Sequence, residues 1–140
     1  MHIRKLIAAT AVMAGAVAGT LATASPASAA ALRYDCRNNG EACLYYNSST
    51  YGFGAYFKQT WDVSSYAGFY FKSGAKGGAG AGVEVKNNAA AVDNNTPARF
   101  RVYYNSNWSC SFACQTFNEY SWGNLNPTMK NNNASGRVVG

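Results

Sequence analysis

A five-residue segment in the first half of the chain returns in the second half. Residues 44–48 read LYYNS and residues 102–106 read VYYNS, 58 positions later. Two more matches follow in the same order along the chain: Asp62-Val63 with Asn124-Leu125, and residues 86–90 (KNNAA) with residues 130–134 (KNNNA). Three matches in one order indicate an internal duplication. The chain is therefore expected to fold as two similar units.

The duplicated segments have the pattern of β-strands. Residues 99–104 alternate with a period of two, which is typical of a half-buried strand. This alternation predicts that Phe100 and Val102 face a core, whereas Tyr103, and by the repeat Tyr45, face outward. Downstream of the N-terminal segment no stretch has a convincing helical period, and glycine- and asparagine-rich turns are frequent. The expected fold class is all-β, a sandwich or barrel of short strands.

The first unit carries an insertion relative to the second, because its last two repeated motifs lie further apart than their counterparts do. The natural place of the insertion is residues 71–82, which include the run KSGAKGGAGAG. A glycine-rich loop that cradles phosphate lies between a strand and a helix. Here the strand-like residues 83–85 (VEV) follow instead. We therefore expect a mobile loop and no phosphate site.

The N-terminus, residues 1–29, has the pattern of a secretory signal peptide. A basic pair at residues 4–5 precedes an uncharged run, residues 6–21, and the segment ends in Ala-Ser-Ala. Signal peptidase accepts small residues at positions −3 and −1, so cleavage is expected after this segment or, alternatively, after Ala31. The prediction is a secreted, extracellular domain of residues 30–140 without a membrane span.

Four cysteines lie in the predicted domain. An even number of cysteines in a small secreted domain indicates disulfides. Three pairings are possible, and the short separations favour Cys36–Cys43 and Cys110–Cys114. A zinc site is disfavoured because the spacing does not fit and because no histidine remains once His2 is removed.

The predicted domain offers little catalytic chemistry. Without histidine it can form neither a Ser-His-Asp triad nor a Cys-His pair. Nothing in the sequence pairs its six carboxylates as glycoside hydrolysis requires. Its ten basic residues exceed the acidic ones by four and are scattered, which disfavours nucleic-acid binding. We expect a monomer that is not an enzyme, needs no cofactor or metal, and binds neither nucleic acid nor membrane.

The repeated segments resemble the Greek keys of βγ-crystallins. Tyr46 and Tyr51, separated by four residues and followed by glycines, resemble the aromatic hairpin that opens such a key. The asparagine-rich residues 87–92 and 131–136 resemble its later part. Together with the signal peptide, the small size and the Cys-Leu-Tyr start at Cys43, these motifs make the chain similar to the Streptomyces metalloproteinase inhibitor family.

This resemblance covers nearly the whole predicted domain. It implies a βγ-crystallin-like double Greek key with key 1 at about residues 43–92 and key 2 at about residues 100–138. It also implies a secreted peptidase inhibitor whose partner is an extracellular protease, with a zinc metalloprotease as the expected target.

In the resembled family, a short disulfide-held loop lies across the protease cleft like a substrate that is not released. The corresponding reactive loop here is Cys110, Ser111, Phe112, Ala113 and Cys114. The resemblance implies that Cys110–Ser111 is the bond presented. If the register moves by one residue, Phe112 is the bulky apolar residue that a thermolysin-type protease prefers after that bond.

A non-catalytic binding module is the alternative. Crystallin-type calcium sites use two Asn or Asp residues followed, after two positions, by hydroxyl residues. Asn131, Asn132 and Ser135 match part of this pattern, but neither unit offers a carboxylate, so they are weak calcium candidates. Carbohydrate binding would use exposed aromatic side chains that stack on sugars. The candidates for this are Tyr45, Tyr103, Trp108 and Trp122.

Overall fold

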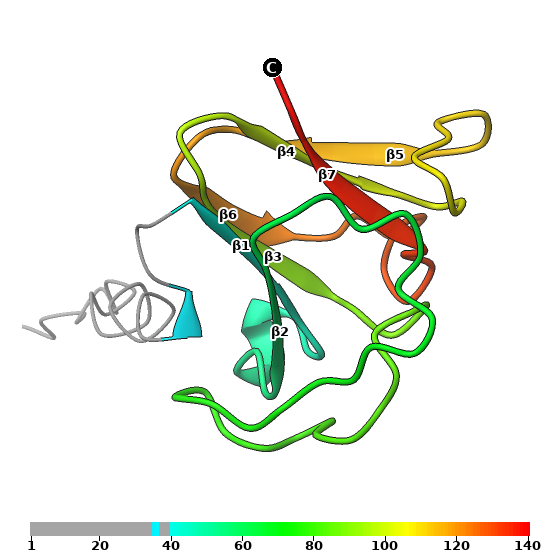
Figure 1. Cartoon of the computed structure of the whole chain (residues 1–140). Coiled ribbons are helices and arrows are strands. Elements are labelled where there is room, and N and C mark those ends of the chain that lie inside the picture. Colours follow the sequence, from blue (N-terminus) through cyan, green and yellow to red (C-terminus); the bar gives the residue numbers. More distant parts are fainter. Residues whose placement is uncertain (1–34, 37–39) are drawn as a thin grey trace, which may run out of the picture.

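The computed structural model describes residues 35–36 and 40–140, and the predicted signal peptide lies outside them. The described residues form seven strands and one short 3-10 helix, shown in Figure 1. These elements are β1 (Glu41–Tyr45), η1 (Ser49–Tyr51), β2 (Tyr56–Gln59), β3 (Ala91–Asn95), β4 (Arg99–Tyr103), β5 (Cys114–Phe117), β6 (Ser121–Asn124) and β7 (Ser135–Val139).

The strands form two antiparallel sheets, and contacts between the strands join the two halves of the chain. One sheet has the order β2-β1-β3-β6 and the other the order β5-β4-β7. Strand β6 of the second half pairs with β3 of the first, with Trp122 opposite Asp93. Reciprocally, Val63 of the first half bridges Gly136 in β7. The predicted all-β double Greek key is confirmed.

The hydrogen bonds of the two halves recur at the offsets of the sequence repeat. The Ala90 amide donates to the Tyr45 carbonyl, and the Ala134 amide donates to the Tyr103 carbonyl, each at 2.8 Å. The offset between the two acceptors is that of the LYYNS and VYYNS segments, and the offset between the two donors is that of the KNNAA and KNNNA segments. The structural repeat therefore coincides with the sequence repeat.

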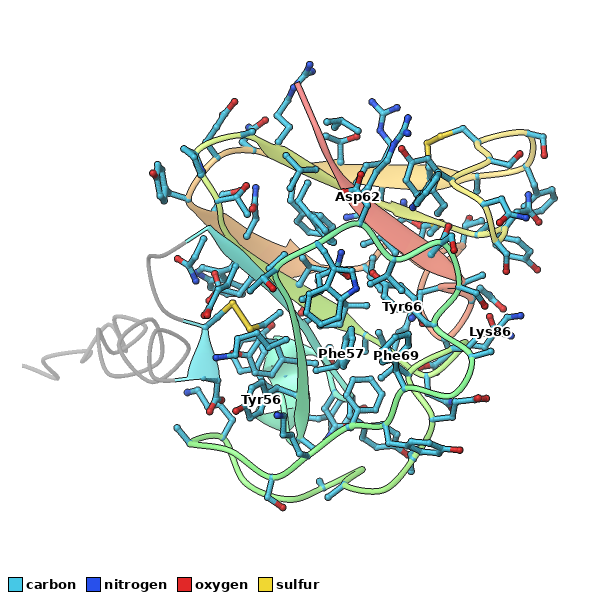
Figure 2. All side chains as sticks on the ribbon, viewed as in Figure 1. Tyr56, Phe57, Asp62, Tyr66, Phe69 and Lys86 are labelled. Atoms are coloured by element: carbon cyan, nitrogen blue, oxygen red, sulfur yellow. A yellow bond between two sulfur atoms is a disulfide. The ribbon has the colours of Figure 1, made fainter. Side chains whose placement is uncertain are left out.

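The main core lies between the two sheets. Phe57 of β2 packs against Tyr66 and Phe69, with ring centres 5.9 and 5.1 Å away, and Figure 2 shows these three rings side by side. The Tyr66 hydroxyl donates a 2.6 Å hydrogen bond to Gln59 Oε1, so the one polar atom of this buried ring is satisfied. Gly136 contributes no side chain, and this leaves room for the Tyr66 hydroxyl.

Tyr45 and Tyr103 are buried, so the prediction that they face solvent is wrong. Tyr45 joins a second cluster with Phe53 and the Cys36–Cys43 disulfide, on the side of β1 away from the main core. Tyr103 is covered by Arg137, whose Nε donates to its hydroxyl at 3.2 Å. Alternation correctly separates the two sides of a strand, but it does not show what covers the outer side.

The glycine-rich insertion is a loop, as predicted, but it is tied to its surroundings. Lys72 exchanges two 2.9 Å backbone hydrogen bonds with Tyr56 and so continues the sheet beyond β2. The Ala79 carbonyl accepts a further bond, 2.8 Å long, from the Ala55 amide. At Gly80 a side chain would overlap the ring of Tyr46. The loop therefore packs closely on the first half, which opposes the expected free mobility.

Candidate functional site

The loop between β4 and β5 is closed by a disulfide. The predicted pairings Cys36–Cys43 and Cys110–Cys114 are both present, with Cα–Cα distances of 5.8 and 5.3 Å. In Figure 1 the yellow connection that contains Cys110–Cys114 extends past the ends of β4 and β5. The sequence thus correctly located a short closed loop at one end of the molecule.

The tip of this loop presents an aromatic side chain to solvent. Phe112 is 68% exposed, and Ser111 beside it is exposed as well. The Phe112 ring rests against Tyr104, with ring centres 4.5 Å apart. An exposed ring of this size that has support on one side can enter an apolar pocket with little loss of conformational freedom.

A small hydrogen-bond network supports the loop from behind. Ser111 Oγ accepts bonds from Asn105 Nδ2 at 3.2 Å and from Ser109 Oγ at 3.0 Å. The Ser111 amide donates to Ser109 Oγ at 3.3 Å. Ser111 therefore joins the loop to its own base. Sequence reasoning missed Asn105, although its place in the repeated YYNS segment was a signal that the residue matters.

The base of the loop is anchored to the body of the protein. Ser135 Oγ donates to the Asn105 carbonyl at 2.7 Å and accepts from the Trp108 amide at 3.1 Å. Trp108 Nε1 donates to the Val63 carbonyl at 3.1 Å. Asn107 and Trp108 have φ values of 59° and 56°, a left-handed conformation that costs a non-glycine residue roughly 1–3 kcal/mol. These bonds hold the indole in place, which argues against Trp108 as a sugar-stacking side chain.

The equivalent hairpin of the first half is closed in another way. The Tyr46 amide donates to the Ala55 carbonyl as the Tyr104 amide does to the Ala113 carbonyl, both at 3.0 Å. Between these ends the first hairpin turns through three consecutive left-handed residues, 52–54. The second hairpin has the disulfide-closed loop at the corresponding positions. The two halves share the hydrogen bond at the ends of the hairpin and differ in the turn that closes it.

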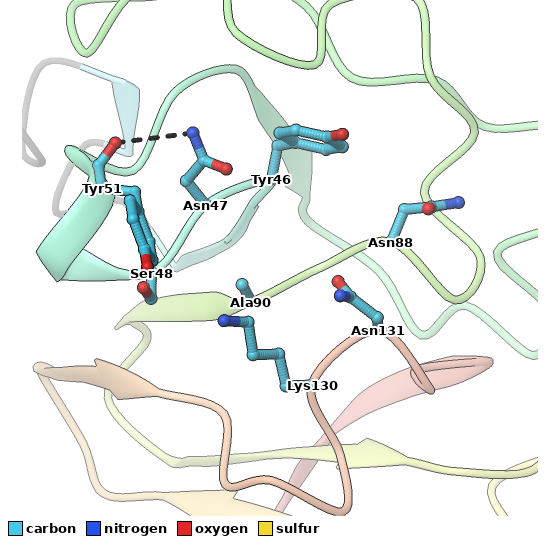
Figure 3. Close-up of a pocket in the computed structure, with 8 residues that line it drawn as sticks. All are labelled: Tyr46, Asn47, Ser48, Tyr51, Asn88, Ala90, Lys130 and Asn131. Atoms are coloured by element: carbon cyan, nitrogen blue, oxygen red, sulfur yellow. Dashed lines mark hydrogen bonds between the residues drawn. The ribbon is translucent and has the colours of Figure 1, made fainter.

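Two hollows lie at equivalent places in the duplicated structure. The first, drawn in Figure 3, has a volume of about 330 Å³ and is lined by Tyr46, Asn47, Ser48, Tyr51, Asn88, Ala90, Lys130 and Asn131. The second, of about 240 Å³, is lined by Lys86, Asn87, Tyr104, Asn105, Ser106, Asn132 and Ala134. The repeat offsets convert every residue of the second set into one of the first. Each set contains one lysine and no carboxylate.

The three calcium candidates are not brought together. Asn131 lines the first hollow and Asn132 the second, whereas Ser135 is buried and donates a hydrogen bond to the Asn105 carbonyl. Within residues 35–36 and 40–140 no three His, Cys, Asp or Glu side chains lie close enough to share a metal ion. A lysine in each hollow adds positive charge where calcium would need ligand charge of the opposite sign.

The strongest pKa shifts lie away from the loop, in the two buried clusters. Burial raises the pKa of Tyr45 far above its usual value of 10, and the Asp35 and Asp93 carboxylates raise it further. Burial alone raises the pKa of Tyr66. Both rings are held neutral at physiological pH, so they belong to the packing of the fold.

Among the described residues no helix is long and apolar enough to cross a membrane.

Comparison with known proteins identifies the fold. No protein-family model matches the chain, and no curated protein does. A structure solved in work on the evolution of the eye-lens βγ-crystallin domain fold is similar, with a TM-score of 0.54 and 14% identity over 71% of this chain and 85% of that one. The fold is that of a βγ-crystallin domain. The N-terminal domain of Protein S aligns with a TM-score of 0.48 and 19% identity, over 71% of this chain and 94% of that one.

Proposed function

We propose that this chain is a secreted protein inhibitor of extracellular proteases that inserts its Cys110–Cys114 loop into the protease cleft. The observation that carries the proposal is the exposed Phe112 side chain on a loop that is closed by a disulfide and supported from within. A rigid loop loses little conformational entropy on binding, so a small interface can still bind tightly.

The loop chemistry favours Ser111–Phe112 as the bond presented to the enzyme. Phe112 supplies the large exposed apolar side chain that a thermolysin-type zinc protease takes after the scissile bond. Ser111 is small and its hydroxyl already accepts two hydrogen bonds, so it suits the position before that bond. If the bond is cut, the disulfide and the network hold the new ends together. Re-formation of the peptide bond then competes with release of the cut inhibitor from the protease.

The setting of the protein agrees with this role. Two disulfides in a domain of this size are typical of an oxidising compartment. The signal-peptide pattern of residues 1–29 directs the chain out of the cell. The inhibitor needs no catalytic group or cofactor of its own, because it acts as a substrate that stays bound.

The test is a titration of a thermolysin-type metalloprotease with the oxidised protein that begins at residue 30. We expect stoichiometric inhibition, and none of a chymotrypsin-type serine protease. Phe112→Ala should weaken inhibition at least tenfold. Tyr120→Ala removes a similarly exposed aromatic ring, at the far end of β5, and should change nothing.

Each outcome of this titration has a defined meaning. Inhibition that survives Phe112→Ala would place the inhibitory surface elsewhere on the molecule. Inhibition of the serine protease alone would show that the target is a serine protease and not a metalloprotease. Inhibition of neither enzyme would refute the proposed function.

A further inference from the structure

We propose that the first hollow is a binding site for an acidic saccharide, a sugar ring that carries a carboxylate. Tyr51 provides the surface on which the ring stacks, and Lys130 pairs with the carboxylate. The site is separate from the Cys110–Cys114 loop and does not depend on protease inhibition. It also differs from the aromatic candidates that the sequence suggested.

Tyr51 is an exposed and rigidly mounted aromatic ring. Its side chain is 72% exposed, the most of any large hydrophobic residue in the described part of the chain. The short helix η1 holds its backbone, because the Tyr51 amide donates to the Ser48 carbonyl at 3.0 Å. Two 2.8 Å hydrogen bonds clamp Ser49 to the Asn124 side chain at the end of β6. A fixed aromatic surface of this kind suits the apolar face of a sugar ring.

Lys130 gives the hollow its charge. Its Nζ lies 5.8 Å from the centre of the Tyr51 ring, within the range of a cation–π contact. No carboxylate lines the hollow, and Lys130 forms no ion pair with any described residue. The ammonium group is therefore available to an anionic ligand. A sugar that displaces the ammonium group from the Tyr51 ring and stacks there would keep its carboxylate within reach of that group.

The remaining lining can satisfy sugar hydroxyl groups. Asn131 is fixed by a left-handed backbone, with φ of 59°, and by a 2.8 Å bond from its amide to the Ala89 carbonyl. The Asn131 side-chain amide makes no hydrogen bond to a described residue, and neither does the Ser48 hydroxyl. Figure 3 shows Lys130 and Asn131 across the hollow from Tyr46 and Tyr51. A volume of about 330 Å³ is at the lower end for small-molecule sites and accommodates a single sugar ring.

The second hollow provides an internal comparison. It has the equivalent lysine, Lys86, and the equivalent tyrosine, Tyr104. At the position that the repeat makes equivalent to Tyr51, however, the second half has Ser109 in place of an aromatic ring. The duplicated site without a stacking surface is therefore expected not to bind the sugar. Lys86→Gln becomes a charge-matched control for Lys130→Gln.

The experiment is calorimetric titration of the oxidised protein with galacturonic-acid oligomers and, separately, with neutral cello-oligosaccharides. We expect the acidic oligomer to bind at least tenfold more tightly than the neutral one. Tyr51→Ala should weaken acidic-oligomer binding at least tenfold, and Lys130→Gln should abolish the preference for the acidic oligomer. Lys86→Gln and Tyr120→Ala should leave binding unchanged, because they alter the same charge and the same kind of exposed ring elsewhere.

Several results would overturn this assignment. These are no binding of the acidic oligomer, equal binding of the neutral one, or binding that is indifferent to Tyr51→Ala and Lys130→Gln. An increase in Tm with calcium that Asn131→Ala abolishes would show a cation site instead. Phe112→Ala should bind the acidic oligomer normally, so this proposal and the inhibitor proposal can fail separately.

Discussion

Asn47 and Asn105 occupy the same position in the two hairpins, yet their side-chain amides bind different partners. Asn47 Nδ2 donates to the Tyr51 carbonyl at 3.5 Å, a bond within its own turn. Asn105 Nδ2 donates to Ser111 Oγ at 3.2 Å and so supports the disulfide-closed loop. The duplication has kept asparagine at this position, but its side chain supports a different structure in each half.

Removing the Asn105 side chain should loosen the Cys110–Cys114 loop without unfolding the protein. A neutral hydrogen bond contributes about 1 kcal/mol, which corresponds to roughly a fivefold change in an equilibrium constant. We expect Asn105→Ala to weaken protease inhibition about fivefold and to speed hydrolysis of the loop during long incubation with the enzyme. Asn47→Ala is the matched control and should leave both quantities unchanged. Equal effects of the two substitutions would contradict a positioning role for Asn105.

The two disulfides should have separable effects on stability and inhibition. By loop-closure entropy each stabilises the fold by only about 2 kcal/mol, because both close short loops. Replacing Cys110 and Cys114 together by serine should abolish inhibition while the protein stays folded by circular dichroism. Replacing Cys36 and Cys43 together by serine should lower the free energy of unfolding about as much as replacing Cys110 and Cys114 does. It should leave inhibition intact. Inhibition that survives loss of Cys110–Cys114 but not loss of Cys36–Cys43 would argue against the loop as the inhibitory element.

A methyl group at Gly136 should be poorly tolerated. A Cβ atom there would overlap the buried Tyr66 hydroxyl and would lie 3.0 Å from Phe100 Cζ. Overpacking of a core typically costs about 1–3 kcal/mol, so Gly136→Ala should lower the free energy of unfolding by at least that amount. Gly123 is a glycine within strand β6, and a Cβ atom there meets only Phe117, at 3.3 Å. In denaturant titrations Gly123→Ala should cost clearly less, and equal costs would contradict the steric explanation.

The buried tyrosines should make the protein sensitive to alkali. The pKa of Tyr45 and that of Tyr66 are both raised in the folded state, by burial in each case and by Asp35 and Asp93 for Tyr45. Below pH 10 both rings are neutral, folded or unfolded, so this contribution to stability is fully present. Above pH 10 only the unfolded chain ionises. The free energy of unfolding should then fall by roughly 1 kcal/mol per pH unit for each ring.

Denaturant titrations at pH 9, 10 and 11 measure this loss. Tyr45→Phe and Tyr66→Phe should each remove about half of the pH dependence above pH 10, whatever they do to stability at neutral pH. An unchanged slope in both variants would show that other groups control alkaline unfolding.

The sequence predicted much of the fold because the repeat constrains it. The LYYNS and VYYNS segments occupy matching ends of β1 and β4, and the alternation around Val102 correctly indicated its core-facing side. Both cysteine pairs were predictable from their short separations. What alternation could not supply was the covering layer, such as Arg137 over Tyr103.

The candidate sites were predictable only where they are local in sequence. The Cys110–Cys114 loop is a contiguous segment, so its residues could be named in advance. The first hollow brings Tyr51 next to Lys130, which lies in the other half of the chain, through the pairing of β6 with β3 and the bond from the Asn131 amide to the Ala89 carbonyl. No single-sequence pattern connects two such residues. Their juxtaposition follows from tertiary structure alone.

The reciprocal pairing of β6 with β3 and of Val63 with Gly136 has a consequence for survival among proteases. A protease cuts a chain only where a stretch of it can leave the fold and lie extended in the active site. Neither half of this molecule can open without breaking these contacts, because β6 belongs to the sheet of the first half and Val63 is bridged to β7 of the second. We therefore expect little partial opening, and we expect digestion of the body to require unfolding of the whole domain. The contacts between the two halves should therefore make the molecule resistant to proteolysis by the enzymes that it is proposed to inhibit.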